Sequence, residues 1–150
     1  MMYHVSEARG GDEAASAEPE QARYPQSSDS VQLFVSDNLI CVAPDATLHE
    51  VAQRLAAEDV GALVVMDGDR VAGIISERDV VRAVASGKDL DLTTAAEYGR
   101  RRVVTCTPHT SVHEAAELMM EHYVRHLLVE DGSGPVGMVS ARDLLGAFAS

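Results

Sequence analysis

The chain has no tryptophan, only two cysteines and few aromatic residues of any kind, at 4%. Two cysteines are too few for a disulfide framework, and Cys41 and Cys106 each lie in a short apolar run, so we expect buried, unreactive thiols. No apolar run approaches the roughly 18 residues needed to span a bilayer. The first residues also lack the charged start and apolar stretch of a secretory signal. These absences predict a cytoplasmic protein without a membrane partner.

Basic residues are also scarce, because 12 Lys and Arg stand against 24 Asp and Glu and leave a net charge of -12 over 150 residues. Such a surface repels a phosphate backbone, which argues against nucleic acid as a partner, although acidic charge also keeps a protein soluble. The sequence has no P-loop and no nucleophile beside a base, so we expect no enzyme activity. The six histidines form no complete ligand set at metal spacing, and we expect no metal.

What the chain does contain is an internal repeat with an offset of 64 residues. Residues 44–50 reappear as 108–114, and residues 73–79 reappear as 137–143. Of the 43 positions aligned between 44–86 and 108–150, 16 are identical and no gap is needed. Repetition over this length predicts two copies of one structural unit.

Each copy has the pattern strand, helix, strand, strand, helix. Thr47 and Ser111 each precede a glutamate by three residues, as at a capped helix start, and apolar residues then recur at helical spacing. The expected elements are strand 39–42, helix 47–58, strands 62–66 and 71–75 and helix 76–86, followed by strand 103–107, helix 111–123, strands 127–129 and 136–139 and helix 140–150. One copy is too small to bury both faces of its sheet. We therefore predict an α/β (α+β) fold in which two pseudo-twofold-related copies pack as one module.

Changes in composition suggest how the chain divides. Residues 1–30 are acidic with almost no spaced apolar residues, which is typical of a disordered tail. A short apolar segment, 31–35, then forms a helical turn or a strand. We assign 31–86 to the first repeat domain, 87–94 to a polar linker and 95–150 to the second repeat domain, with a short helix over 93–98.

A Gly-x-x-Ser-x-x-Asp motif occurs at the strand-to-helix junction of each copy, at 73–79 and 137–143. Its glycine lets a ligand or a neighbouring backbone approach closely. Its serine stands at a helix N-terminus, which favours an anion, and its aspartate can accept two hydroxyl hydrogens, as from a ribose. The same serine and aspartate also form an ordinary capping box without any ligand. The motif alone leaves both interpretations open.

Residues 31–150 resemble a tandem pair of CBS domains, the modules named after cystathionine β-synthase. The similarity lies in residues 45–51, 61–65 and 71–80 and in their counterparts. It implies a compact pseudo-symmetric pair with two clefts between the repeats, a homodimer, and binding of an adenine nucleotide (AMP, ADP or ATP) in one or both clefts. Many family members have proline where this chain has Val64 and Leu128, so the shape of the clefts is expected to differ.

The resemblance also implies roles for individual residues. Asp79 and Asp143 would hold ribose hydroxyls, and Ser76 and Ser140 would contact phosphate. The expected ligand-binding set is Ser76, Arg78, Asp79, Ser140, Arg142, Asp143, Arg125, His126, Arg101, Ile40, Val42 and Val104.

The two copies differ in charge at equivalent positions. Residues 37–38, Asp-Asn, become Arg-Arg at 101–102 beside Arg100, and residues 61–62, Gly-Ala, become Arg-His at 125–126. In nucleotide-binding relatives a basic pair at the latter place resembles a phosphate contact, and guanidinium groups pair two oxygens at once. We expect these residues to attract phosphates and to make one cleft stronger than the other. The alternative is that residues 100–102 form surface ion pairs with acidic neighbours.

The favoured function is a non-enzymatic regulatory module. It would bind an adenine nucleotide between its repeats, with no further cofactor, and signal by conformational change to an unidentified protein in trans. The alternative is a ligand-free dimeric interaction protein whose Ser/Asp motifs only cap helices.

Overall fold

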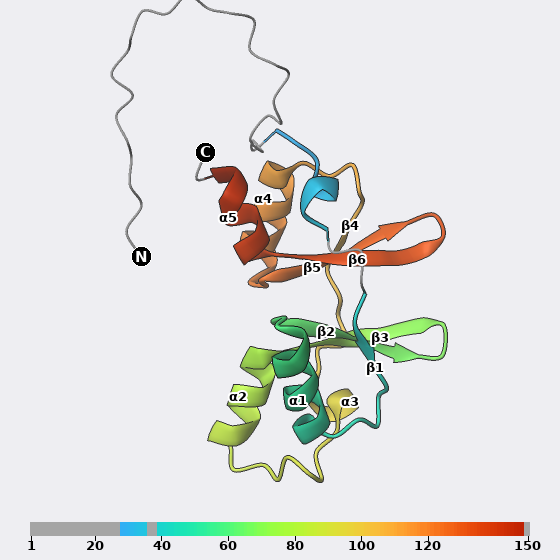
Figure 1. The fold of residues 1–150 in the computed structure, drawn as a ribbon, viewed down its shortest axis with the longest axis vertical. Helices are drawn as coiled ribbons and strands as arrows, with labels where there is room; N and C mark the ends of the chain where they lie inside the picture. The colour runs from blue at the N-terminus through green and yellow to red at the C-terminus, as the bar shows by residue number, and fades with distance from the viewer. Residues whose placement is uncertain (1–27, 36–38, 149–150) are drawn as a thin grey trace, which may run out of the picture.

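A computed structural model describes residues 28–35 and 39–148 of the chain. Both copies follow the predicted order of elements (Figure 1). The elements are η1 (Val31–Phe34), β1 (Cys41–Val42), α1 (Leu48–Glu58), β2 (Ala62–Asp67), β3 (Arg70–Ser76), α2 (Glu77–Ala85), α3 (Ala95–Tyr98), β4 (Thr105–Cys106), α4 (Val112–His122), β5 (His126–Asp131), β6 (Gly134–Ser140) and α5 (Ala141–Phe148). In these described ranges, every helix is too short or too polar to cross a bilayer. The predicted α/β class is confirmed.

Each copy is built on a three-stranded mixed sheet with the same strand order, β1-β2-β3 and β4-β5-β6. The first strand runs parallel to the second, and the second and third strands form an antiparallel hairpin. A bulge interrupts each hairpin at the same place, between Val65 and Met66 in the first copy and between Val129 and Glu130 in the second. The sequence repeat is therefore a structural repeat that extends to the register of the strands.

The long helices begin where the sequence places their caps. Oγ1 of Thr47 accepts a hydrogen bond from the N–H of Glu50 at 3.1 Å, and the Glu50 carboxylate accepts from the N–H of Thr47 at 2.9 Å. Ser111 and Glu114 form the same capping box at the start of α4. Each first turn thus satisfies its own N–H groups, which fixes where the apolar faces of α1 and α4 meet their sheets.

Two separate apolar cores lie on the helix side of the sheets. Leu63 and Val65 of β2 pack with residues of α1 and α2, and the equivalent residues of β5 pack with α4 and α5. Because side chains alternate along a strand, Val64 and Leu128 point to the opposite face of their sheets. Both are fully buried, and both lie outside the two cores. The two sheets lie between the helices of the two lobes (Figure 1), so the lobes meet through these faces.

The segments that precede the first strand of each copy are exchanged between the lobes. Val31 of η1 is buried in the core of the second lobe, where its N–H donates to the carbonyl of Thr110 at 2.8 Å. Ala95 of α3 is buried in the core of the first lobe, where its N–H donates to the carbonyl of Ala46 at 2.8 Å. Each lobe is therefore completed by residues that the sequence assigns to the other repeat.

Because of this exchange, the chain is already ordered before the predicted tail, 1–30, ends. Residues 1–27 of that tail lie outside the described residues, but its last residues are paired with the second lobe. Ser30 forms a β-bridge with Ser111, and the carbonyl of Asp29 accepts from the N–H of Val112 at 2.8 Å. The prediction is corrected at Asp29 and Ser30, because the burial of Val31 brings them to the start of α4.

Candidate functional site

Two clefts lie between the lobes, and each contains one copy of the Ser-x-x-Asp motif. The first, called here the Ser140 cleft, has a volume of about 720 Å³ and is bordered by Ile40, Gly61, His126, Met138, Ser140 and Asp143, among others. The second, called here the Ser76 cleft, has a volume of about 80 Å³ and is bordered by Ile74, Ser76, Asp79, Arg100, Arg102 and Val104, among others. The clefts are therefore related by the repeat but differ greatly in size.

Each cleft draws on both copies in the same way. The Ser140 cleft combines the β6–α5 junction of the second copy with residues 39–40 and 59–62 of the first. The Ser76 cleft combines the β3–α2 junction of the first copy with residues 103–104 and 123–126 of the second, which are the equivalent positions. A ligand in either cleft would therefore contact both lobes.

In the Ser140 cleft the aspartate of the motif is exposed. Oδ2 of Asp143 accepts a hydrogen bond from the N–H of Ser140 at 2.8 Å, and Oγ of Ser140 accepts from the N–H of Asp143 at 3.1 Å. These two bonds complete a helix cap. Oδ1 of Asp143 has no hydrogen-bond partner among the described residues and remains available to a hydroxyl group of a ligand.

In the Ser76 cleft the equivalent aspartate, Asp79, is buried and has no free carboxylate oxygen. Asp79 is 2% exposed, and its Oδ2 accepts hydrogen bonds from the N–H and the Oγ of Ser76 at 2.8 and 3.0 Å. Its Oδ1 accepts from Nη2 of Arg82 at 2.6 Å, which makes an ion pair. Both carboxylate oxygens are thus used within the protein. Both motifs form helix caps, but only the motif at Asp143 keeps an unused oxygen.

The difference between the motifs originates at one position of the repeat. Arg82 lies one turn after Asp79 on α2, and the residue 64 positions later is Gly146 on α5. Because glycine has no side chain, nothing on α5 at this position can neutralise Asp143. The spacing between Asp79 and Arg82 is visible in the sequence, although the burial that makes this ion pair matter is not.

Three charged or polar side chains, Glu77, Arg125 and His126, border both clefts. Glu77 comes from the first copy, and Arg125 and His126 come from the second. Their counterparts are the small residues Ala141, Gly61 and Ala62, so each ionisable group of the shared wall is present in only one of the two copies. A side chain at Gly61 would begin 3.1 Å from Nε2 of His126, which shows how closely the imidazole fills the space left by this glycine.

The environment of His126 disfavours its charged form. Burial lowers the pKa of this imidazole below its usual 6.5. The carboxylates of Asp143 and Glu77 act against burial and raise the pKa, whereas the guanidinium of Arg125 lowers it further. An anion bound beside His126 would raise the pKa of the imidazole, because its negative charge stabilises the protonated form that burial disfavours.

The arginines of the Ser76 cleft are positioned by a close backbone contact. Residue 100 forms a β-bridge with Ile74, with N–H to O distances of 2.8 and 3.0 Å in the two directions. A Cβ atom at Gly73 would lie 2.5 Å from the carbonyl oxygen of Arg100, so this position requires glycine. The motif glycine of the first copy therefore admits a neighbouring backbone rather than a ligand.

The structure brings ten of the twelve predicted ligand residues to the two clefts. Ile40, Ser140, Arg142 and Asp143 border the Ser140 cleft, Ser76, Arg78, Asp79 and Val104 border the Ser76 cleft, and Arg125 and His126 border both.

Two of the predicted residues border neither cleft and are corrected. Arg101 borders neither cleft, although Arg100 and Arg102 on either side of it border the Ser76 cleft. Val42 packs instead against the apolar core of the first lobe. The first-copy counterparts of Arg101 and Arg102, residues 37–38, lie outside the described residues. The predicted surface ion pairs are absent for residues 100–102 in the part of the chain that the structure describes.

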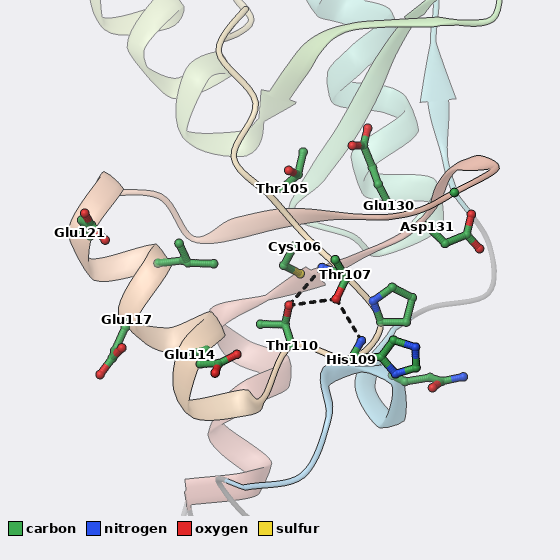
Figure 2. A pocket seen from close by; sticks show the side chains of 14 residues that line it. Thr105, Cys106, Thr107, His109, Thr110, Glu114, Glu117, Glu121, Glu130 and Asp131 are labelled. Atoms are coloured by element: carbon green, nitrogen blue, oxygen red, sulfur yellow. Dashed lines mark hydrogen bonds between the residues drawn. The ribbon is translucent and has the colours of Figure 1, made fainter.

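A third cavity, of about 1080 Å³, lies on the second lobe away from both motifs (Figure 2). Five carboxylates from α4 and β5 border it, and they repel a phosphate group; these are Glu114, Glu117, Glu121, Glu130 and Asp131. The thiol of Cys106 also borders it, and burial raises the pKa of this thiol to about 11, which keeps it protonated. Among the described residues, no group of three His, Cys, Asp or Glu side chains could hold a metal ion. This larger cavity is unsuited to a nucleotide.

Comparison with known proteins matches this architecture. A sequence model of the CBS domain matches residues 31–86 and 95–150. A 17.7 kDa protein of Acidianus ambivalens is 36% identical over 120 residues, which cover 79% of this chain and 72% of that protein. A CBS-domain-containing protein from Agrobacterium tumefaciens has a similar structure, with a TM-score of 0.74 and 30% identity over 79% of this chain and 98% of the other.

One similar structure contains a nucleotide. The CBS domain protein of Pyrobaculum aerophilum, complexed with AMP, has a TM-score of 0.69 and is 30% identical, with 81% of this chain and 99% of that chain covered. Proteins with such pairs of CBS domains are regulatory. The two matched segments, the repeated sheet topology and the two inter-lobe clefts lead to one conclusion: this chain belongs to the CBS domain family.

Proposed function

We propose that this CBS pair is a non-enzymatic regulatory module that binds an adenine nucleotide in the Ser140 cleft. The observation that supports this choice of cleft is the unused Oδ1 atom of Asp143, which stands in a cavity of about 720 Å³. Ligand pockets usually measure about 300–1,000 Å³, so a nucleotide is of suitable size. The AMP complex of the Pyrobaculum protein supports the ligand class.

The lining of the cleft matches the parts of a nucleotide. Ile40, Val60, Met138 and Leu145 offer apolar surface to a base, and Oδ1 of Asp143 offers an acceptor to a ribose hydroxyl. Arg125, Arg142 and His126 offer cations and ring N–H groups to phosphate oxygens. The position of Asp143 beside His126 brings the ribose and phosphate contacts into one continuous cavity.

The mechanism would be a shift between arrangements of the lobes. Because the Ser140 cleft is formed by both copies, a bound nucleotide stabilises whichever arrangement makes all of its contacts at once. The free energy available for regulation equals the difference in affinity between the two arrangements. A partner protein in trans would read the altered surface.

A homodimer is part of this proposal, and its support is an exposed apolar position that repeats. Val81 on α2 and Leu145 on α5 occupy equivalent positions, and each side chain is 64% exposed. Equivalent exposed apolar positions on a helix of each lobe suit a symmetric contact between two copies. Light scattering of the full chain should give the mass of a dimer, and a Val81→Asp variant should give that of a monomer.

The nucleotide proposal is tested by calorimetry and thermal unfolding with adenosine, AMP, ADP, ATP and S-adenosylmethionine. A ligand at 100 times its Kd should raise the free energy of unfolding by about 2.7 kcal/mol. Asp143→Asn should weaken that ligand about tenfold, because it removes the charged acceptor. Glu114→Gln is the matched control, since Glu114 caps α4 in the same way but lies away from both clefts.

A second candidate function is a ligand-free interaction protein. The observation in its favour is that both motifs form complete capping boxes without a ligand. No binding of any of the five compounds, together with dimer formation, would favour this candidate and reject the first.

A further inference from the structure

Six arginines in the described part of the chain have no ion pair with a described residue, and four of these six border the Ser76 cleft. Arg54, Arg70 and Arg82 each form an ion pair with an acidic residue. In contrast, the four arginines that border the Ser76 cleft have no ion pair with any described residue; these are Arg78, Arg100, Arg102 and Arg125. All four are exposed, and they concentrate positive charge at one small cleft of a chain that has twice as many acidic as basic residues.

The anionic groups of the same cleft do not balance these cations. Its two carboxylates belong to Glu77 and Asp79, and Asp79 is already neutralised by Arg82 from outside the cleft. Four guanidinium groups therefore border the cleft beside one carboxylate, that of Glu77, which has no ion pair among the described residues. An oxyanion in the cleft would offset this excess of positive charge and could receive bidentate hydrogen bonds. The charge of the cleft therefore favours an anionic ligand.

The size of the cleft limits what this anion can be. Its volume of about 80 Å³ is one ninth of the Ser140 cleft and is far below the range of pockets that hold nucleosides. Asp79 also has no oxygen left to accept a ribose hydroxyl, because Ser76 and Arg82 use both. A nucleoside thus lacks both room and a ribose partner in this cleft.

We propose that the Ser76 cleft binds a phosphate-class oxyanion without a nucleoside, held by Arg78, Arg100, Arg102 and Arg125. Arg125 is common to this site and to the nucleotide site proposed for the Ser140 cleft, whereas Arg78, Arg100 and Arg102 border the Ser76 cleft alone and allow the two proposals to be tested separately. The oxyanion could be a free ion, with inorganic pyrophosphate as the probe, or the terminal phosphates of a nucleotide that reaches across this shared wall.

Calorimetry of the full chain with pyrophosphate at low salt, in EDTA, tests the site. Binding should weaken at least tenfold in the double variant Arg100→Gln, Arg102→Gln. It should change by less than twofold in Arg101→Gln, which alters the same segment but borders neither cleft. Arg78→Gln, an exposed residue of α2, gives a second reading if the double variant fails to fold.

The same variants distinguish the sources of the oxyanion. Pyrophosphate binding that survives Asp143→Asn identifies a free ion, even if no nucleotide binds at all. If pyrophosphate does not bind, and the double variant weakens the affinity for ATP but not for AMP, the oxyanion is the terminal phosphates of a nucleotide. The proposal is overturned if neither the double variant Arg100→Gln, Arg102→Gln nor Arg78→Gln changes the affinity for pyrophosphate or ATP. It is also overturned if Arg101→Gln weakens binding as much as the double variant does.

Discussion

Nη2 of Arg82 lies 2.6 Å from Oδ1 of Asp79, and at the equivalent point of the second copy Gly146 leaves Asp143 without a cation. One substitution within the repeat thus gives two copies of the same motif different properties. The buried aspartate is a structural element of the first lobe, whereas the exposed aspartate is available to a ligand. The predictions below follow from this difference and from the wall shared by the two clefts.

An arginine at position 146, equivalent to Arg82, should prevent Asp143 from binding a ligand in the Ser140 cleft. We expect Gly146→Arg to pair with Asp143 and to weaken nucleotide binding about tenfold, as measured by calorimetry, because Oδ1 would then be occupied. The same change should stabilise the protein by about 1 kcal/mol, since glycine is a poor helix former and nothing lies closer than 3.9 Å to a Cβ at this exposed position. Gly146→Ala is the control, with similar stabilisation and unchanged affinity.

Removing the Arg82 side chain, which neutralises the buried Asp79, should destabilise the first lobe. Arg82→Ala leaves the buried carboxylate of Asp79 with hydrogen bonds from Ser76 only. Loss of a buried ion-pair partner costs about 3–5 kcal/mol, but the Arg82 side chain is 53% exposed, so we expect about 1–2 kcal/mol in urea unfolding. Arg70→Ala, which breaks the exposed pair with Asp67, should cost less than about 1 kcal/mol. Equal costs would contradict the structural role of Asp79.

The stability of the protein should depend on pH through His126. The pKa of this histidine is lowered in the folded state, so the unfolded chain takes up its proton first as the pH falls below about 6.5. The free energy of unfolding should therefore decrease from that pH downward, until the folded protein is protonated as well. His126→Gln should remove this part of the dependence, and its difference from the wild type should be constant above pH 7.5.

The close contact at Gly73 predicts a large effect of a small change. A Cβ atom there would lie 2.5 Å from the carbonyl oxygen of Arg100, so Gly73→Ala must separate the bridge between residue 100 and Ile74. We expect a loss of about 1–3 kcal/mol in urea unfolding. Because Arg100 and Arg102 would move with the backbone, pyrophosphate binding should fall as well. Unchanged stability would show that the segment is not held as described.

Local features of the sequence were sufficient to predict most of the fold. Capping pairs such as Thr47 with Glu50, and apolar runs of strand length, identify the elements because they act over a few residues. The placement of Ser140 and Asp143 at a cleft was expected from the resemblance to CBS domains, because the motif alone was also compatible with a helix cap.

Features that depend on distant contacts could not be predicted. All three arginines at 100–102 were expected to attract phosphates, but only Arg100 and Arg102 border a cleft, and the path of this segment depends on a bridge to the distant Ile74. The exchange of Val31 and Ala95 between the lobes depends on which core has room for them, and no local pattern reports that. The unequal volumes of the clefts arise from packing of the whole pair.

The exchanged segments also determine where a ligand can act. Beyond each exchanged segment the chain borders a cleft, with residues 39–40 at the Ser140 cleft and residues 100 and 102–104 at the Ser76 cleft. The chain therefore passes between the lobes next to residues that border the proposed binding sites. A ligand in either cleft would therefore directly restrain a segment that connects the lobes. Binding at either site could then fix the relative arrangement of the lobes without an intermediate structural element.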